Sequence, residues 1–105
     1  DLTGEWVQIN SESEDSYQEA TITEDTITVN WVAPDSTALY WAGTFEAPTT
    51  ADEPYSRDSV NDTEQTSTAI LASPDETKTF TYEDGQISYE VSMMGVTTTV
   101  RLEKQ

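Results

Sequence analysis

The clearest structural signal in the sequence is TKTFTYEDGQISYEVSM, residues 77–93. Residues 77–82 and 86–93 alternate polar and apolar side chains, which is typical of β-strands with one buried face. Between them, Glu83-Asp84-Gly85 supplies an Asp-Gly pair, which readily adopts the positive φ angles of a tight hairpin turn. One face of the second strand carries Ile87, Tyr89, Val91 and Met93. The stretch therefore predicts an antiparallel hairpin whose apolar face lies in the core.

The residues that follow extend this hairpin. Met94-Gly95 permits a second reversal, after which residues 96–103 alternate again. One predicted face holds Val96, Thr98, Val100 and Leu102, and the other holds Thr97, Thr99, Arg101 and Glu103. Residues 77–103 are thus predicted to form a three-stranded meander.

A second meander is predicted in the first half of the chain. Strands at 18–23, 26–33 and 37–47 are separated by the turn signals Glu24-Asp25 and Pro34-Asp35-Ser36. We expect much of the core from two aligned rows, which are Ile27, Val29 and Trp31 on one strand and Leu39, Trp41, Gly43 and Phe45 on the next. An opening strand at 2–9 and an acidic polar loop at 10–16 precede them.

The two meanders are joined by a less regular region. Residues 48–54 form a connection rich in Pro, Thr and acids, residues 55–61 suit a strand, and residues 66–72 suit either a strand or a helical turn. The count is close to eight strands in one domain, residues 1–105. Short turns make successive strands antiparallel, and an even number lets the first strand pair with the last. The predicted fold is all-β, a small antiparallel up-and-down barrel of lipocalin-like type, with a two-sheet β-sandwich as the alternative.

Composition excludes many functions. The chain has no His and no Cys, so Ser-His-Asp and Cys-His sites, soft-ligand zinc sites and thiol switches cannot be built. Its formal charge is −17, with 21 acidic and only 4 basic residues, which disfavours nucleic-acid and anionic-membrane binding. No apolar run is long enough for a membrane span. Because the chain starts at Asp1 instead of Met, we expect that leading residues have been removed.

The sequence shows two resemblances to known proteins. Gly4-Glu5-Trp6 is similar to the Gly-x-Trp motif of the calycin superfamily, the lipocalin-like barrels. That resemblance implies that Trp6 plugs one barrel end and that Arg101, on the last strand, packs against it. Over most of its length the chain also resembles small lipoprotein-type domains of Gram-positive bacteria, through its Trp-containing first strand, Glu14-Asp15-Ser16 and Tyr40-Trp41-Ala42-Gly43. This second resemblance implies an exported location, at the cell surface or extracellular, and is compatible with a lipid anchor upstream of Asp1.

Aromatic residues are the candidate ligand-binding groups. Aromatic rings stack on sugars, peptides and apolar ligands, and the candidates are Trp31, Tyr40, Trp41, Phe45 and Tyr89. The alternative is that they fill the core, which is the interpretation we prefer for Trp31 and Trp41. Tyr40 has the opposite strand parity from Trp41 and is therefore predicted to be the exposed contact.

The carboxylates allow two further hypotheses. A close pair could support hydrolysis if one acid were buried, but 21 acids in 105 residues produce pairs anywhere. Oxygen-rich loops at 11–16, 52–53 and 61–64 carry calcium-type ligands, yet none has the spacing of a dedicated calcium loop. We therefore predict no catalytic residues, no metal site and no cofactor.

These observations favour a non-enzymatic, monomeric binding or interaction module of a bacterial cell-surface lipoprotein. Its expected partner is a small ligand or a protein of unknown identity. The acids are interpreted first as a solubilising coat. The alternative function is an acidic decoy or inhibitor of a basic partner, which would need its acids gathered on one exposed face.

Overall fold

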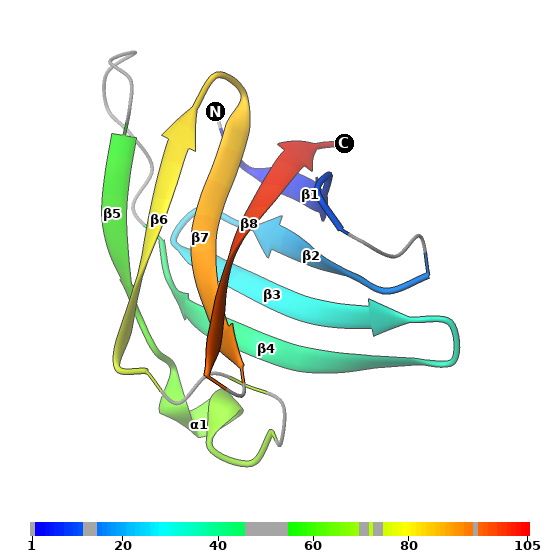
Figure 1. The fold of residues 1–105 in the computed structure, drawn as a ribbon. Helices are drawn as coiled ribbons and strands as arrows, with labels where there is room; N and C mark the ends of the chain where they lie inside the picture. Colours follow the sequence, from blue (N-terminus) through cyan, green and yellow to red (C-terminus); the bar gives the residue numbers. More distant parts are fainter. Residues whose placement is uncertain (1, 12–14, 46–54, 70–71, 73–74, 94) are drawn as a thin grey trace.

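The computed structural model describes residues 2–11, 15–45, 55–69, 72, 75–93 and 95–105. Within these ranges the chain forms eight strands and one short helix (Figure 1). The elements are β1 (Gly4–Gln8), β2 (Tyr17–Ile22), β3 (Thr26–Ala33), β4 (Ser36–Thr44), β5 (Tyr55–Val60), α1 (Thr63–Thr66), β6 (Thr77–Glu83), β7 (Gln86–Met93) and β8 (Val96–Lys104). No described segment forms a helix that is long and apolar enough to cross a membrane.

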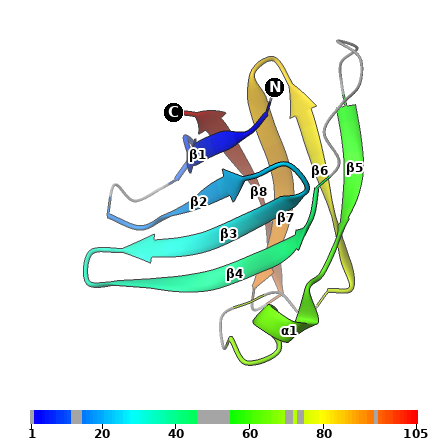
Figure 2. The same cartoon turned by 180° about the vertical axis from the view of Figure 1, so that it is seen from behind.

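The strands form one antiparallel sheet in the order β4-β3-β2-β1-β8-β7-β6-β5. Figures 1 and 2 show the two meanders, with β2–β4 running across the view and β5–β8 running up it. β1 pairs with β8, so the first strand joins the last, as the barrel hypothesis requires. Among the described residues, the backbone pairing at the seam between β4 and β5 is limited to one bridge, between Gly43 of β4 and Asn61, the residue that follows β5. The fold is therefore a nearly closed up-and-down barrel, and the ladder between β1 and β8 excludes two separate sheets.

Turn chemistry explains the second meander. Asp84 and Gly85 have φ angles of 55° and 78°, as the predicted β6–β7 hairpin requires. Gly95, with φ 82°, makes the reversal between β7 and β8. The hairpin predicted from residues 77–93 is confirmed.

The region between the meanders is partly described. Residues 55–61 give the strand β5, as predicted. The helical turn α1 begins at Thr63, ahead of the predicted segment at 66–72, because the side chain of Asp62 accepts a hydrogen bond from the Glu64 amide and caps it. Of that segment, residues 70 and 71 lie outside the described residues, as do the end of the predicted strand 37–47 and the connection 48–54.

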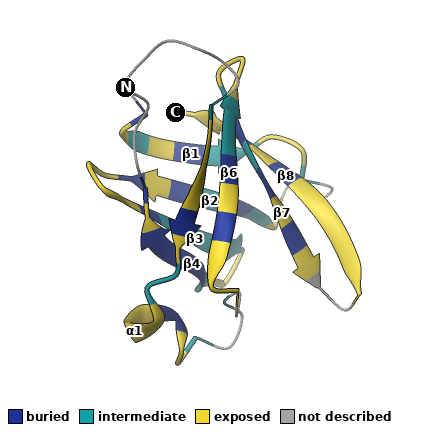
Figure 3. Cartoon of the chain, turned by 90° about the vertical axis from the view of Figure 1, so that its left-hand side faces the viewer, coloured by how far each residue is buried: buried dark blue, intermediate teal, exposed yellow. Residues whose placement is uncertain are grey.

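The core lies inside the barrel. Figure 3 shows buried positions separated by exposed ones along the strands, as expected when one strand face points inward. Its fully buried large side chains include Trp6, Trp41, Ile22, Ile27, Ile87 and Leu102. The predicted inner face of β8 is only half correct, because Val100 and Leu102 are buried whereas Val96 is 64% exposed. Residues 96–99 are all exposed, so only the second half of β8 contributes to the core.

Candidate functional site

Most of the aromatic residues predicted to bind a ligand are buried. Tyr40, Trp41, Phe45 and Tyr89 are each at most 8% exposed and belong to the core cluster, and Trp31 packs against it half-buried. Trp41 has no exposed surface, and its indole N–H donates to the Ser59 hydroxyl at 2.9 Å. The core-filling alternative therefore holds for these four residues, and Trp31 alone of the five is left partly open to solvent.

The prediction that Tyr40 is an exposed contact is wrong, because a β-bulge turns this residue inward. The pairing of β3 with β4 shifts by one residue, so that Val29 pairs with Trp41 and Asn30 with Leu39. Tyr40 is the extra residue of this β-bulge, which breaks the strict alternation of side chains along β4. Its ring is 4% exposed and lies edge-on to Trp31, with the ring centroids 5.5 Å apart.

Trp6 is buried, whereas Arg101 does not lie against it. Trp6 is 1% exposed, donates its indole N–H to the Leu2 carbonyl at 2.9 Å and meets the Tyr82 ring edge-on. Arg101, however, is exposed and stands between the buried Val100 and Leu102, so its side chain leaves the barrel on the outer face. In the β1–β8 ladder the residue paired with Trp6 is Lys104. The basic residue adjacent to the tryptophan is thus Lys104, and the predicted packing of Arg101 on Trp6 is wrong.

A small pocket opens beside Trp31, at the end of the barrel where β3 ends and β8 begins. We call it the Gln18 pocket. It has a volume of about 200 Å³, and apolar walls formed in part by Val91, Val100 and the exposed Val96. Gln8, Gln18 and Thr98 supply the polar lining. Gln18 and Trp31 are directly paired neighbours on β2 and β3, so their side chains rise from the same face of the sheet.

The side chain of Gln18 has an unused hydrogen-bond donor. Gln18 has no exposed surface, and its Oε1 accepts the hydroxyl hydrogen of Tyr89. In the described part of the chain its Nε2 has no hydrogen-bond partner. A buried polar group without a partner costs about 1–3 kcal/mol of stability, so the amide would gain from an acceptor placed in the pocket.

One neighbour, Tyr89, holds the side-chain amide of Gln18, and a second, Gln8, holds its backbone. Burial raises the pKa of Tyr89 well above 10.0, with the nearby Tyr40 adding to the effect, so the phenol stays protonated and keeps donating to Gln18 Oε1. On the other side, Gln8 Oε1 accepts the backbone N–H of Gln18 at 2.8 Å. Asn10 accepts from Gln8 Nε2 at 3.2 Å and donates to the Thr99 carbonyl at 2.8 Å, which holds the end of β1 against β8.

The carboxylates provide no comparable site within the described ranges. Glu19 and Asp62 are half-buried, and every other described Asp or Glu is exposed. The described residues contain no group of three or more metal-ligating side chains. Of the calcium-type loops, residues 52–53 and part of 11–16 lie outside the described residues, and in the third Asp62 is used to cap α1.

Comparison with protein-family models, with curated proteins and with solved structures gives no significant match to this chain. The Gln18 pocket must therefore be interpreted from its own geometry.

Sequence reasoning missed Gln18, although a signal for it exists. In the predicted strand 18–23, Gln18 has the same parity as Ala20 and Ile22, and all three are buried. A glutamine in an otherwise apolar row is the pattern of a buried polar group, which needs partners inside the fold.

Proposed function

We propose that this protein is a non-enzymatic binding module and that the Gln18 pocket is its ligand site. The observation that carries the proposal is the Gln18 amide, a fully buried donor without a partner in the described structure at an opening lined mainly by apolar groups. Native folds satisfy nearly all buried polar groups, and an exception is a reason to look for a missing partner.

The chemistry of the pocket defines the ligand class. The volume of about 200 Å³ is smaller than the roughly 300–1,000 Å³ of sites for drug-sized molecules, so the ligand is compact. Val91, Val96 and Val100 favour an apolar body, and the flat ring of Trp31 offers a surface for stacking. The free donor of Gln18 calls for one acceptor such as a ketone or ether oxygen. A formal charge of −17 disfavours anions, so this acceptor is uncharged.

The distribution of the acids supports this proposal over the acidic decoy. Described carboxylates lie on both meanders, on α1 and in turns, for example Glu5, Asp35, Asp58, Glu64 and Glu103. A decoy would need them gathered on one face, whereas a solubilising coat needs them on all faces.

The likeness to calycins and to Gram-positive lipoprotein-type domains extends the proposal to location. We place the protein outside the cell or at its surface, where a soluble acidic barrel can collect small molecules. The nearly closed barrel of eight antiparallel strands is compatible with that likeness.

An NMR titration tests the proposal. Cyclohexanone, an uncharged ring with one acceptor, should shift the signals of the Gln18 side-chain amide and of Val96 saturably, and methylcyclohexane should bind more weakly. Gln18→Leu should abolish the preference for the ketone, while Gln86→Leu, the same change on the outer face of β7, should preserve it. Equal binding of the two compounds to the unaltered protein, or no saturable shift at the pocket, would contradict the proposal.

A further inference from the structure

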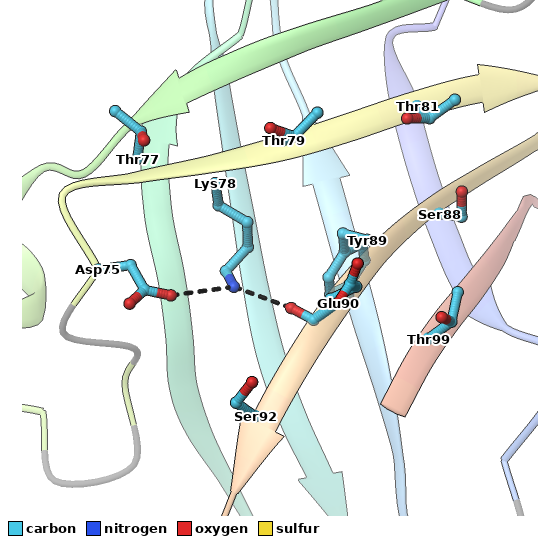
Figure 4. A pocket seen from close by; sticks show the side chains of 10 residues that line it. All are labelled: Asp75, Thr77, Lys78, Thr79, Thr81, Ser88, Tyr89, Glu90, Ser92 and Thr99. Carbon is cyan, nitrogen blue, oxygen red and sulfur yellow. Dashed lines mark hydrogen bonds and ion pairs between the residues drawn. The ribbon is translucent and has the colours of Figure 1, made fainter. Parts of the chain in front are cut away.

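The ladder between β6 and β7 opens away from their hairpin turn. The two strands pair only at Thr81 with Ser88, Tyr82 with Ile87, and Glu83 with Gln86. Both strands continue well beyond these pairs, and each remains paired on its other side, with β5 and β8 respectively. A groove of about 420 Å³ follows the opening, and we call it the β6–β7 groove (Figure 4).

The register shows which backbone groups face the opening. Along a strand, successive residues direct their N–H and C=O groups to alternate sides. Lys78 Nζ reaches the Glu90 carbonyl at 2.9 Å, so the backbone of Glu90 points toward β6, and that of Ser92 does likewise. Ser88 lies two residues before Glu90, so its backbone also points toward β6, and its partner Thr81 points back toward β7. Thr79 and Thr77 lie two and four residues before Thr81, so their backbones point toward β7 as well. No ladder pairing joins these two sets along the described length of β6 and β7.

Lys78 closes part of this gap from the inside. Its side chain is 6% exposed, and its ammonium lies 5.2 Å from the centroid of the Tyr40 ring and 5.6 Å from that of Trp41. The same ammonium lies 3.7 Å from the carboxylate of Asp75. Figure 4 shows it between Asp75 and the Glu90 carbonyl, where the N–H of a neighbouring strand would otherwise be.

The rims of the groove are polar and acidic. Side chains on the outer face, which include Thr77, Thr79, Ser88 and Ser92, line it with hydroxyl groups. The carboxylates of Asp75 and Glu90 also line it, and Asp58 accepts a hydrogen bond from Thr79 at 2.6 Å. Among the residues that line the groove, Asp75 and Glu90 outnumber the single cation, Lys78. Beside the groove, Asp58 adds a third acid next to Thr79, and Arg101, the partner of Ser88 on β8, adds a second cation.

We propose that the β6–β7 groove receives an extended basic peptide segment of a partner protein, which inserts as a strand between β6 and β7. Main-chain hydrogen bonds give such strand addition its affinity. The backbone groups of Thr77, Thr79 and Ser92 that face the opening supply them, together with the Glu90 carbonyl once the segment displaces Lys78 from it. Outward side chains of the segment are Lys or Arg, which meet Asp58, Asp75 and Glu90. Inward side chains are apolar, because they enter the barrel beside Tyr89. This site is distinct from the Gln18 pocket, because the two cavities share no lining residue.

A synthetic peptide, acetyl-Lys-Val-Lys-Val-Lys-amide, tests the proposal on the whole chain. Its addition should shift the backbone amide signals of Thr77, Thr79, Glu90 and Ser92 saturably. The same peptide N-methylated at both valines keeps its charge but loses main-chain donors, and should bind about tenfold more weakly. The acidic counterpart, acetyl-Glu-Val-Glu-Val-Glu-amide, should not bind.

Variants of the protein distinguish insertion of the peptide as a strand from its general attraction to the negatively charged protein. Lys78→Met removes the group that competes for the Glu90 carbonyl and should raise the affinity several-fold. Lys104→Met, which changes the net charge equally at the Trp6 end of β8, should have a much smaller effect. If Lys78→Met does not fold, Glu90→Gln is the alternative variant, because it removes one acidic charge from the groove and leaves the backbone unchanged. It should lower the affinity for the peptide several-fold. Its control is Glu103→Gln on the outer face of β8, which should change the affinity much less.

Three results would overturn the proposal. One is that the N-methylated peptide binds as tightly as the unmethylated one, which would show that charge attraction alone accounts for the binding. Another is shifts confined to residues outside the groove, or no binding of the probe at all. The third is concentration-dependent protection of the same four amides in the protein alone, which would assign the groove to a second copy of the chain.

Discussion

Tyr89 on β7 donates its phenolic hydrogen to the side-chain carbonyl of Gln18 on β2, two strands that are separated in the sheet by β1 and β8. This bond crosses the barrel interior and ties one meander to the other. Gln18 lines the pocket beside Trp31, and Tyr89 lines the β6–β7 groove. The two cavities are therefore linked through one buried hydrogen bond.

Replacing the phenol of Tyr89 tests how much this hydrogen bond contributes to stability. Tyr89→Phe should lower the free energy of unfolding by about 1–3 kcal/mol, because Gln18 Oε1 then loses its donor inside the core. Urea denaturation near neutral pH gives the value. Tyr55→Phe, on the half-buried start of β5, is the control and should cost less. An unchanged stability of the Tyr89 variant would show that the bond contributes nothing.

The raised pKa of Tyr89 also predicts a pH dependence. In the unfolded chain this tyrosine loses its proton near pH 10.0, whereas the folded protein retains it. The folded state then binds more protons, so the contribution is fully present below pH 10.0 and is lost as pH rises above that value. Stability of the wild type should fall more steeply in this alkaline range than that of Tyr89→Phe, as measured by urea titrations at several pH values. Parallel curves would contradict the assignment.

Trp6 should be the most costly single truncation at the β1 end. Trp6→Ala removes a ring that is 1% exposed and should lower stability by about 3–5 kcal/mol, enough to unfold a domain this small. Trp6→Phe keeps most of the packing but loses the bond to the Leu2 carbonyl, and should cost roughly 1 kcal/mol beyond its lost volume. Denaturation curves of both variants would check this order, and a stable alanine variant would refute the role of Trp6 as a plug.

The outward direction of Arg101 predicts a small effect for its removal. Arg101→Ala should change stability by no more than about 0.5 kcal/mol, as is usual for exposed positions. If Arg101 instead packed on Trp6, the loss would be larger and would not add to that of Trp6→Ala. A double-mutant cycle over the two positions measures this coupling, which we expect to be near zero.

Added salt should stabilise the protein. The described acids are exposed or half-buried at a formal charge of −17, so the folded state contains strong self-repulsion. Raising NaCl from about 0.01 M to about 1 M shortens the screening length from roughly 30 Å to roughly 3 Å. The Tm should therefore rise. Sodium chloride is preferred to sulfate because sulfate also strengthens hydrophobic burial, and a Tm independent of NaCl would contradict the prediction.

The strands were predictable because local patterns determine them. Alternation and Asp84-Gly85 define the β6–β7 hairpin, and the same alternation places Ile87, Tyr89 and Val91 in the core. The β-bulge at Tyr40 was not predictable in this way, since a bulge adds one residue without a distinct local signature. Nor does a period of two show where a sheet opens, which is why the β6–β7 groove emerges only from the structure. The inward direction of Lys78, by contrast, follows from the parity that it shares with the buried Phe80.

Arg101 is a different kind of error. Its parity, opposite to that of Val100 and Leu102, was already visible in the sequence and placed it outside the barrel. The family resemblance suggested contact with Trp6, and the alternation of the strand contradicted it. Lys104 has the required parity, and the register confirms it as the neighbour of Trp6.

The ladder between β1 and β8 has a consequence for how the chain folds. Each of the two meanders is built from strands that are neighbours in sequence. Their loops are short except for residues 61–76, which contain α1 and join β5 to β6. Trp6 and Lys104, by contrast, are brought together from nearly opposite ends of the chain. Closing so long a loop costs more conformational entropy than any hairpin here, and such distant pairings slow folding. We expect docking of the first strand onto the last to be the late, rate-determining event, with the two halves present as transient units before it.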